Sequence, residues 1–303
     1  MKPQKILLTG VNGQVGHALL PKLSHYQVVA LSRSELDLSN QDEIRRVLRK
    51  IKPNLIINPA AYTAVDKAES EPEVAYAINA ESARTLAEEA AKLGAALMHF
   101  STDYVYDGKK SAPYVETDAT SPMGVYAKSK LAGEEAIRAV GLPHLILRTS
   151  WVYGAYGKNF LKTILRLAGE RDSLRIVADQ IGAPTSSESI ADAILKLVEH
   201  WQPAQENQSG IYHFTNTGST SWHGFACEIV NEYHKLGIAP ALKTRVENIA
   251  AITTADYPTP AARPANSRLD NTKLKQTFRI ELPTWQQALH DVMQSLKEGL
   301  KEV

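Results

Sequence analysis

The sequence predicts an α/β protein built on a doubly wound parallel sheet. Through the first 150 residues, short apolar runs that suit strands buried on both faces alternate with helical stretches. The first run, 5–9, ends at Gly10, and a helix is expected over 14–24. Such alternation is typical of βαβ units, which place helices on both faces of a parallel sheet.

The other expected elements follow the same order. Strands are predicted at 28–31, 55–57, 96–101 and 145–148, and helices near 40–51, 72–93 and 124–139. Beyond residue 150 the alternation becomes irregular, with expected strands near 174–177 and 211–214, helices near 188–200, 222–236 and 284–299, and a Pro/Ala-rich stretch at 255–266. We therefore divide the chain into a first domain, 1–150, and a smaller lobe, 151–303, some segments of which return to the first domain. The lobe is expected to cover the carboxyl ends of the strands, where such sheets bind ligands.

Composition narrows the class of protein. Apolar residues make up 44% of the chain and charged residues 22%, which is ordinary for a soluble globular protein. Thirty-four basic and 33 acidic residues leave a net charge of +1, which argues against nucleic acid as a partner. Cys227 is the only cysteine, so no internal disulfide and no multi-thiolate metal site can form. The sequence shows neither a membrane-spanning apolar run nor a signal-peptide pattern, so we expect a cytoplasmic protein without a membrane partner.

A glycine-rich turn follows the first strand. Gly10, Gly13 and Gly16 have the spacing G-x-x-G-x-x-G between a strand and a helix. The first glycine permits a tight turn, the second lets the backbone approach a pyrophosphate, and the third allows close helix–sheet packing. Phosphate would then lie on the free amides of the helix that begins at Gln14 and Val15. The pattern predicts a Rossmann-like dinucleotide site.

The end of the second strand indicates which nicotinamide cofactor is bound. NAD sites usually carry an acid there for the ribose 2′-hydroxyl, whereas this strand runs into Ser32 and Arg33, and the first acid is Glu35. A guanidinium suits a 2′-phosphate, so we expect NADPH, with NADH tolerated. The alternative is that Arg33 is a solvated surface charge.

Tyr126 and Lys130 are the strongest candidates for catalysis. Residues four apart share one face of a helix, so the phenol and the ammonium can point into one pocket. A nearby ammonium favours phenolate, so we expect a lowered Tyr126 pKa and proton transfer near neutral pH. Thr102, at the end of the fourth strand, is expected to contact a substrate oxygen in preference to Ser101, which faces the other way. The alternative is a chance Tyr-x-x-x-Lys on a helix with a solvated lysine.

A strand ending in Ser/Thr, followed by a helix with Tyr-x-x-x-Lys, resembles the short-chain dehydrogenase/reductase superfamily in its extended, nucleotide-sugar-modifying branch. Finer strings resemble the dTDP-4-dehydrorhamnose reductases, at 58–69, 101–108, 148–154, 179–185 and 263–270. This resemblance runs over nearly the whole chain. It implies NAD(P)H-dependent reduction of the 4-keto group of dTDP-6-deoxy-L-lyxo-4-hexulose to dTDP-L-rhamnose.

The resemblance also implies roles for individual residues. It makes Tyr126 the proton donor, Lys130 a ligand of the nicotinamide ribose, and Thr102 and Asp103 contacts of the sugar. The remaining implied contacts are Asp37 and Leu38 at the adenine, Ala60, Ala61 and Tyr62 at the middle of the cofactor, Trp151 at the sugar, and Asn159 and Arg263 at the substrate diphosphate. Trp151 could instead be a core aromatic, and Arg263 a structural loop charge.

No metal site is predicted. Some members of the resembled family bind Mg²⁺ through glutamates at a dimer contact, but here Ala18 stands where such an acid is expected on the first helix, although Glu188 remains. A homodimer stays open, whereas a magnesium-bridged contact is not expected. The histidines lack mutual metal-ligand spacing and are expected to be packed or surface imidazoles; those considered are His99, His213, His223 and His290.

Three other functions compete with the reductase. A nucleotide-sugar dehydratase of the same superfamily would carry Glu after the Thr-Asp pair, whereas Tyr104 stands there. Another nucleotide-sugar reductase or epimerase is a second alternative, and a non-catalytic subunit resembling the regulatory subunit of methionine adenosyltransferase is a third. The sequence does not decide between dTDP and UDP substrates, the NADPH/NADH ratio in use, the oligomeric state or the need for a multienzyme partner.

Overall fold

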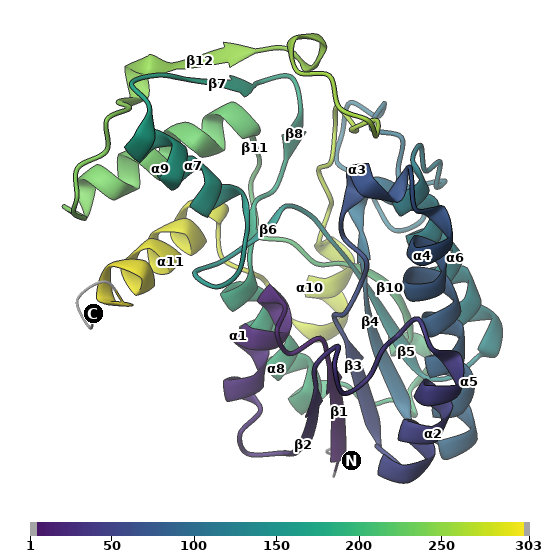
Figure 1. Cartoon of the computed structure of the whole chain (residues 1–303). Helices are drawn as coiled ribbons and strands as arrows, with labels where there is room; N and C mark the ends of the chain where they lie inside the picture. Colours follow the sequence, from purple (N-terminus) through teal and green to yellow (C-terminus); the bar gives the residue numbers. More distant parts are fainter. Residues whose placement is uncertain (1–4, 300–303) are drawn as a thin grey trace.

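A six-stranded parallel sheet forms the centre of the computed structural model, which describes residues 5–299 (Figure 1). Its strand order is β10-β5-β4-β3-β1-β2, and every neighbouring pair is parallel. The strands are β1 (Lys5–Thr9), β2 (Gln27–Leu31), β3 (Leu55–Asn58), β4 (Ala96–Thr102), β5 (His144–Thr149) and β10 (Gly210–His213). The predicted α/β class and doubly wound parallel sheet are confirmed.

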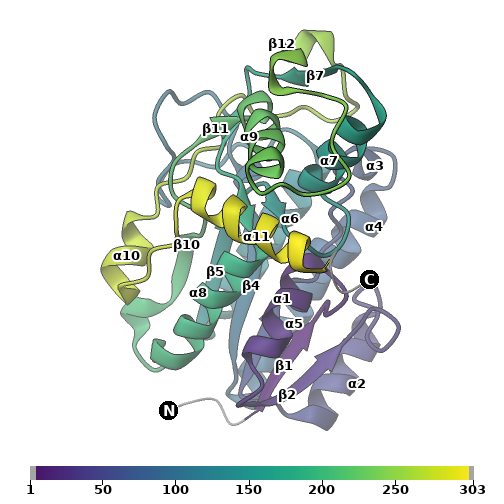
Figure 2. The same cartoon turned by 90° about the vertical axis from the view of Figure 1, so that its left-hand side faces the viewer.

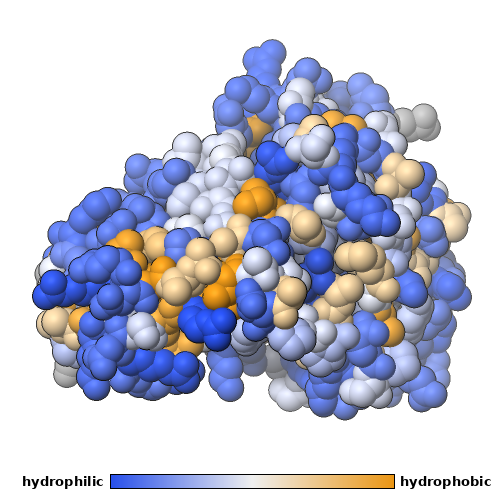
Figure 3. Space-filling view, turned by 90° about the horizontal axis from the view of Figure 1, so that it is seen from above, coloured by the Kyte–Doolittle hydropathy of each residue, from blue (hydrophilic) through white to orange (hydrophobic). Residues whose placement is uncertain are grey.

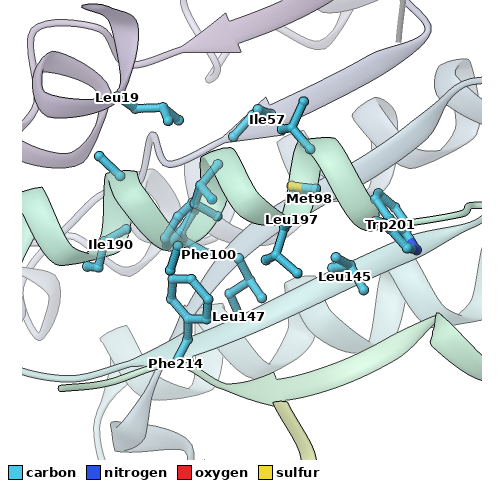
Figure 4. Close-up of a cluster of buried hydrophobic side chains, with 14 of the residues drawn as sticks. Leu19, Ile57, Met98, Phe100, Leu145, Leu147, Ile190, Leu197, Trp201 and Phe214 are labelled. Carbon is cyan, nitrogen blue, oxygen red and sulfur yellow. The ribbon is translucent and has the colours of Figure 1, made fainter. Parts of the chain in front are cut away.

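Helices cover both faces of this sheet, and the apolar runs supply a core on each side. Along β1, Ile6 and Leu8 face one core while Leu7 faces the other, as strand alternation requires. On the first side α1 (Gln14–Lys22) and α8 (Ser187–His200) pack over the core shown in Figure 4. On the second side lie α2 (Gln41–Ile51), α5 (Ser82–Leu93) and α6 (Val125–Val140). Each fully buried aliphatic side chain contributes roughly 1.5–3 kcal/mol, so these two cores fix the sheet on which the site is built.

A second group of elements lies beyond the carboxyl ends of the strands. Figures 1 and 2 both place α7, α9, β7 and β12 there. This lobe has its own apolar core, built on α7 (Phe160–Glu170), α9 (Trp222–Lys235) and α11 (Trp285–Gly299). Its strands pair as β7 (Leu174–Val177) with β12 (Ile249–Ile252), β8 (Ile181–Gly182) with β11 (Thr220–Ser221), and β6 (Val152–Tyr153) with β9 (Thr185–Ser186). The division at residue 150 stays a prediction, and α8 and β10 from the second half pack on or pair within the main sheet.

Several elements differ from the sequence-based expectation. The helix predicted over 72–93 is three pieces: α4 (Pro72–Tyr76), a π-helical turn (Ala77–Glu81) and α5. Within the turn, the Asn79 side-chain amide accepts from the Tyr62 backbone N at 2.9 Å and donates to the Tyr62 carbonyl at 3.1 Å. The short helix α3 (Val65–Ala68), α7 and α10 (Thr272–Phe278) were not predicted.

The strand order contains one switch point. From β1 the chain passes to β2 on one side and to β3 on the other, so the carboxyl ends of β1 and β3 open a crevice between them. The Thr9 hydroxyl spans the two strand ends by donating to Asn58 Oδ1 at 2.6 Å. Within residues 5–299, no helix is long and apolar enough to cross a membrane, and no three His, Cys, Asp or Glu side chains are grouped to hold a metal ion.

Candidate active site

The glycine-rich turn has the geometry that a dinucleotide needs. Gly10 has φ +60°, and a Cβ there would lie 2.9 Å from the Ala60 Cβ, so only glycine fits. A Cβ at Gly16 would collide with the Gly10 carbonyl, so Gly16 lets α1 begin against the turn. No side chain caps the N-terminus of α1 at Gly13, which leaves its first amides to an anionic ligand. The turn therefore fits a pyrophosphate.

The end of β2 combines a buried hydroxyl with an exposed guanidinium. The Ser32 N and Oγ both donate to Glu35 Oε2, at 2.8 and 2.7 Å, and these bonds lower the pKa of Glu35. The Arg33 side chain is exposed, and no hydrogen bond like those of Ser32 holds its guanidinium among residues 5–299. Leu38 is buried, and the Asp37 carboxylate accepts from the Ser39 N and Oγ. The predicted adenine-side residues thus lie at one strand end, with Arg33 free to turn toward a phosphate.

Helix α6 carries Tyr126 and Lys130 and is held at its first turn. Glu69 Oε1 accepts from the Val125 backbone amide at 2.9 Å. Ser129 Oγ donates to the Tyr126 carbonyl at 2.8 Å and accepts from Asn79 Nδ2 at 3.0 Å. The π-helical turn therefore fixes the position of the catalytic helix.

Tyr126 lines a small pocket between α6 and the C-terminal 259–264 segment. The ring lies edge-on to Tyr104, with centroids 6.0 Å apart. Burial raises the pKa of Tyr126 to about 12, and hydrogen bonding with Thr102 offsets only part of this rise. The expectation of a lowered pKa is wrong for this structure, because burial of the phenol dominates and the Lys130 ammonium is engaged by the Phe100 carbonyl. The other pocket residues are Val65, Met123, Gly124, Ala127, Ala261, Ala262 and Pro264.

Thr102 and Asp103 lie together at the end of β4. The Thr102 Oγ1 donates to Asp103 Oδ1 at 3.0 Å and accepts from the Tyr104 amide at 3.2 Å. Burial raises the pKa of Asp103 to about 6, against opposing hydrogen bonds from Ser267 and Thr102. Asp103 Oδ2 is buried without a partner of good hydrogen-bond geometry among residues 5–299. A buried acceptor of this kind is suited to a sugar hydroxyl.

Lys130 lies deeper in the same site and is almost fully buried. Its Nζ donates to the Phe100 carbonyl at 2.5 Å and lies 3.2 Å from His99 Nε2. Burial lowers the pKa of Lys130 to about 8, and the charge of Glu134 opposes this shift. His99 was expected to be a packed or surface imidazole, and it is packed; its contact with Lys130 was not predicted.

The lobe brings three further predicted residues toward the sheet. Trp151 has φ +48° and stacks on Trp222, with centroids 3.5 Å apart. Asn159 caps α7 and donates to Gln14 Oε1 at 2.9 Å, beside the glycine-rich turn. Arg263 Nη2 lies 2.9 Å from Asp66 Oδ2. Figure 3 shows the molecule from above, where several apolar patches, most of them in the left half of the view, lie among mostly hydrophilic residues.

Comparison with known proteins identifies the family. The model described as the RmlD substrate binding domain matches residues 4–298. The dTDP-4-dehydrorhamnose reductase of Burkholderia thailandensis is 48% identical over 290 residues, covering 94% of this chain and 96% of that protein. The chain belongs to the dTDP-4-dehydrorhamnose reductase family. The enzyme of Escherichia coli K12 is 43% identical over 296 residues, covering 96% and 97% of the two chains.

A solved dTDP-4-dehydrorhamnose reductase shares the fold of this chain. The Bacillus anthracis enzyme, crystallised in complex with NADP, superposes with a TM-score of 0.88 at 36% identity. The match covers 97% of this chain and 100% of that one. The family membership and the fold implied by the sequence motifs are thereby confirmed, and the fit of the glycine-rich turn to a dinucleotide agrees with that complex.

Proposed function

We propose that this chain reduces the 4-keto group of dTDP-4-dehydrorhamnose to give dTDP-L-rhamnose, with NADPH as the reductant. The observation that carries the proposal is the meeting of Tyr126, Thr102 and Asp103 at the end of β4, one strand from the β1/β3 crevice. The names of the full-length relatives supply the substrate. The alternatives of dehydratase and binding subunit have no such support, because Tyr104 replaces the dehydratase glutamate and the Tyr-Lys pair is intact.

In this proposal each residue of the site has a separate role in the reduction of the carbonyl group. NADPH supplies the hydride when bound, and the glycine-rich turn and Lys130 hold it. With a pKa of about 12, Tyr126 carries its proton at neutral pH and can give it to the oxygen that becomes negative. The Thr102 hydroxyl donates to Asp103 Oδ1 in the structure and would turn to donate to that same oxygen, where a nearby donor stabilises the developing charge. The Asp103 Oδ2 is free to accept from a neighbouring sugar hydroxyl.

Lys130 assists Tyr126 through its charge. Once Tyr126 has given up its proton, the phenolate needs a nearby positive charge, and Lys130 lies one helical turn away on the same face. In this proposal Lys130 also contacts the nicotinamide ribose, Arg33 the 2′-phosphate, Trp151 the sugar, and Arg263 and Asn159 the diphosphate. The proposal further includes a cytoplasmic location and no nucleic-acid or membrane partner, and it leaves a homodimer open.

The direct test uses purified protein, NADPH and the 4-keto sugar nucleotide. We expect the absorbance of reduced nicotinamide to fall only when the sugar nucleotide is present, and mass spectrometry with NMR to identify dTDP-L-rhamnose. An epimerase would instead convert the keto sugar without net consumption of NADPH. Absence of turnover with protein that binds NADPH would reject the proposal.

A further inference from the structure

A chain of four polar side chains crosses the interior of the sheet from β1 to α6. The Thr9 Oγ1 lies 2.6 Å from Asn58 Oδ1, Asn58 Nδ2 lies 3.0 Å from His99 Nδ1, and His99 Nε2 lies 3.2 Å from Lys130 Nζ. None of the four residues is more than 2% exposed. The chain begins beside Gly10 at the switch point and ends at the lysine of the candidate site. Buried polar groups are costly unless paired, and each of these four side chains has a partner within the chain.

A buried ammonium has three N–H donors to satisfy. The Phe100 carbonyl takes one from Lys130 at 2.5 Å, and carbonyl oxygen can only accept. His99 Nε2 is the second partner, which leaves one donor for the cofactor side. Loss of the second partner would leave a charged donor unsatisfied in a low-dielectric site.

We propose that His99 is a positioning residue for the reduction. With the Asn58 amide turned over relative to its orientation in the structure, His99 Nε2 accepts from the Lys130 ammonium, fixes Nζ and stabilises the charged form of the lysine. The inference rests on the proposed function. It predicts a neutral imidazole with its proton on Nδ1, since Nε2 must keep a lone pair. Burial and the charge of Lys130 both lower the pKa of His99 well below its ordinary value, so the ring stays neutral.

The orientation of the Asn58 amide is coupled to this charge. With Asn58 Nδ2 toward the ring, His99 Nδ1 accepts and the ring proton lies on Nε2, an arrangement that suits an uncharged lysine amine. With the amide turned over, Oδ1 accepts from Nδ1–H and Nε2 accepts from the ammonium. The Thr9 hydroxyl can donate or accept, so it is compatible with both arrangements.

The other charged and titratable groups around Lys130 have partners or positions of their own. Glu134, one turn further along α6, is paired with Arg148 of β5 through bonds at 2.9 and 2.5 Å. Tyr126 on α6 lines the pocket described above, Asp103 is buried at the end of β4, and Asn58 of β3 is neutral. His99 is therefore the neighbour through which the charge of Lys130 can be changed with the fewest other effects.

Two variants test whether Lys130 needs the imidazole ring of His99 or only a hydrogen-bond acceptor at the position of Nε2. His99→Gln keeps an amide oxygen near the Nε2 position, whereas His99→Asn is too short to reach Lys130. In wild type, kcat/KM should fall above pH about 8, where Lys130 loses its proton. In His99→Asn we expect this fall of kcat/KM at high pH, the alkaline limb of the pH profile, to begin about one pH unit lower. That shift corresponds to the loss of one charge-assisted hydrogen bond. The KM for NADPH should also rise. In His99→Gln the limb should stay close to that of wild type.

A control variant and an NMR measurement on wild type test the inference even if the His99 variants do not fold. His144→Asn, at the amino-terminal end of the neighbouring strand β5, is the matched control and should leave the limb in place. In NADP-bound wild type, imidazole nitrogen NMR shifts should show the Nδ1–H tautomer of His99. An Nε2–H tautomer, or an unchanged limb in folded His99→Asn, would overturn the inference. Wild type that binds NADPH without reducing the sugar nucleotide would instead reject the proposed function, and the tautomer would still report on the contact.

Discussion

Arg263 Nη2 lies 2.9 Å from Asp66 Oδ2, an ion pair that joins the C-terminal 255–266 segment to α3 beside the Tyr126 pocket. The Arg263 side chain is only 17% exposed, and its Nη1 donates to the Ala261 carbonyl at 3.2 Å. The guanidinium has further donors that these two contacts do not use. Arg263 can therefore brace the loop and still reach an anionic substrate, so the structural and binding interpretations need separate tests.

Arg263→Gln should raise the KM for the sugar nucleotide about 10- to 100-fold, with a smaller change in kcat. The reason is the loss of a charge-assisted hydrogen bond to the diphosphate, worth roughly 1.5–3 kcal/mol. Steady-state kinetics measures the effect, with the exposed Arg245→Gln as control. An Arg263→Gln variant with wild-type KM but a lower melting temperature would make Arg263 a structural loop charge.

Glu69→Ala should destabilise the protein by about 1 kcal/mol, because the Val125 amide at the start of α6 loses its acceptor. Glu69→Gln keeps an acceptor oxygen and should recover most of this loss. Urea unfolding followed by circular dichroism gives the comparison. Equal stability of all three proteins would show that the contact contributes nothing to the helix.

Arg33→Asp should lower the ratio of kcat/KM for NADPH to that for NADH by at least about 10-fold. A carboxylate repels the 2′-phosphate and accepts from the 2′-hydroxyl of NADH instead. Arg84→Asp, on the surface of α5, controls for the change in net charge. If the ratio stays constant, Arg33 is a solvated surface charge and the preference arises elsewhere at the end of β2.

Asp103 should make the protein less stable as pH rises. Its folded pKa of about 6 lies above the ordinary value of 3.8, so the folded state binds the extra proton between these values. The contribution is fully present below pH about 4 and is lost by pH about 7, a change of about 3 kcal/mol from a shift of about two units. Asp103→Asn should remove this slope in denaturant titrations of the unliganded protein. A slope identical to that of wild type would mean that the carboxyl titrates normally.

The sheet could be predicted because strands that are buried on both faces consist of short runs of apolar residues. β4, for example, is buried at all seven positions and was expected within one residue of its observed end. The break in the helix predicted over 72–93 could not be found in this way. Residues 77–81 are compatible with a regular helix. The hydrogen bonds of Asn79 within this turn go to the backbone of Tyr62, a contact 17 residues apart that helical spacing does not reveal.

The candidate site was predictable where spacing along one element decides it. Tyr126 and Lys130 share a face because they are four residues apart on one helix. The direction of the Tyr126 pKa shift was not, since burial comes from Tyr104 and from the distant Ala261 and Pro264. The contact of His99 with Lys130 likewise depends on how α6 packs on β4, across 31 positions of sequence.

The most direct test of the account is the turnover number of Tyr126→Phe. The variant keeps the ring and its packing but cannot give a proton, so kcat should fall about 10²- to 10⁴-fold. NADPH binding, measured by fluorescence titration, should be unchanged, and Tyr212→Phe serves as a control for loss of a buried hydroxyl remote from the site. A Tyr126→Phe variant that retains near-wild-type kcat would contradict the assignment of Tyr126 as the proton donor.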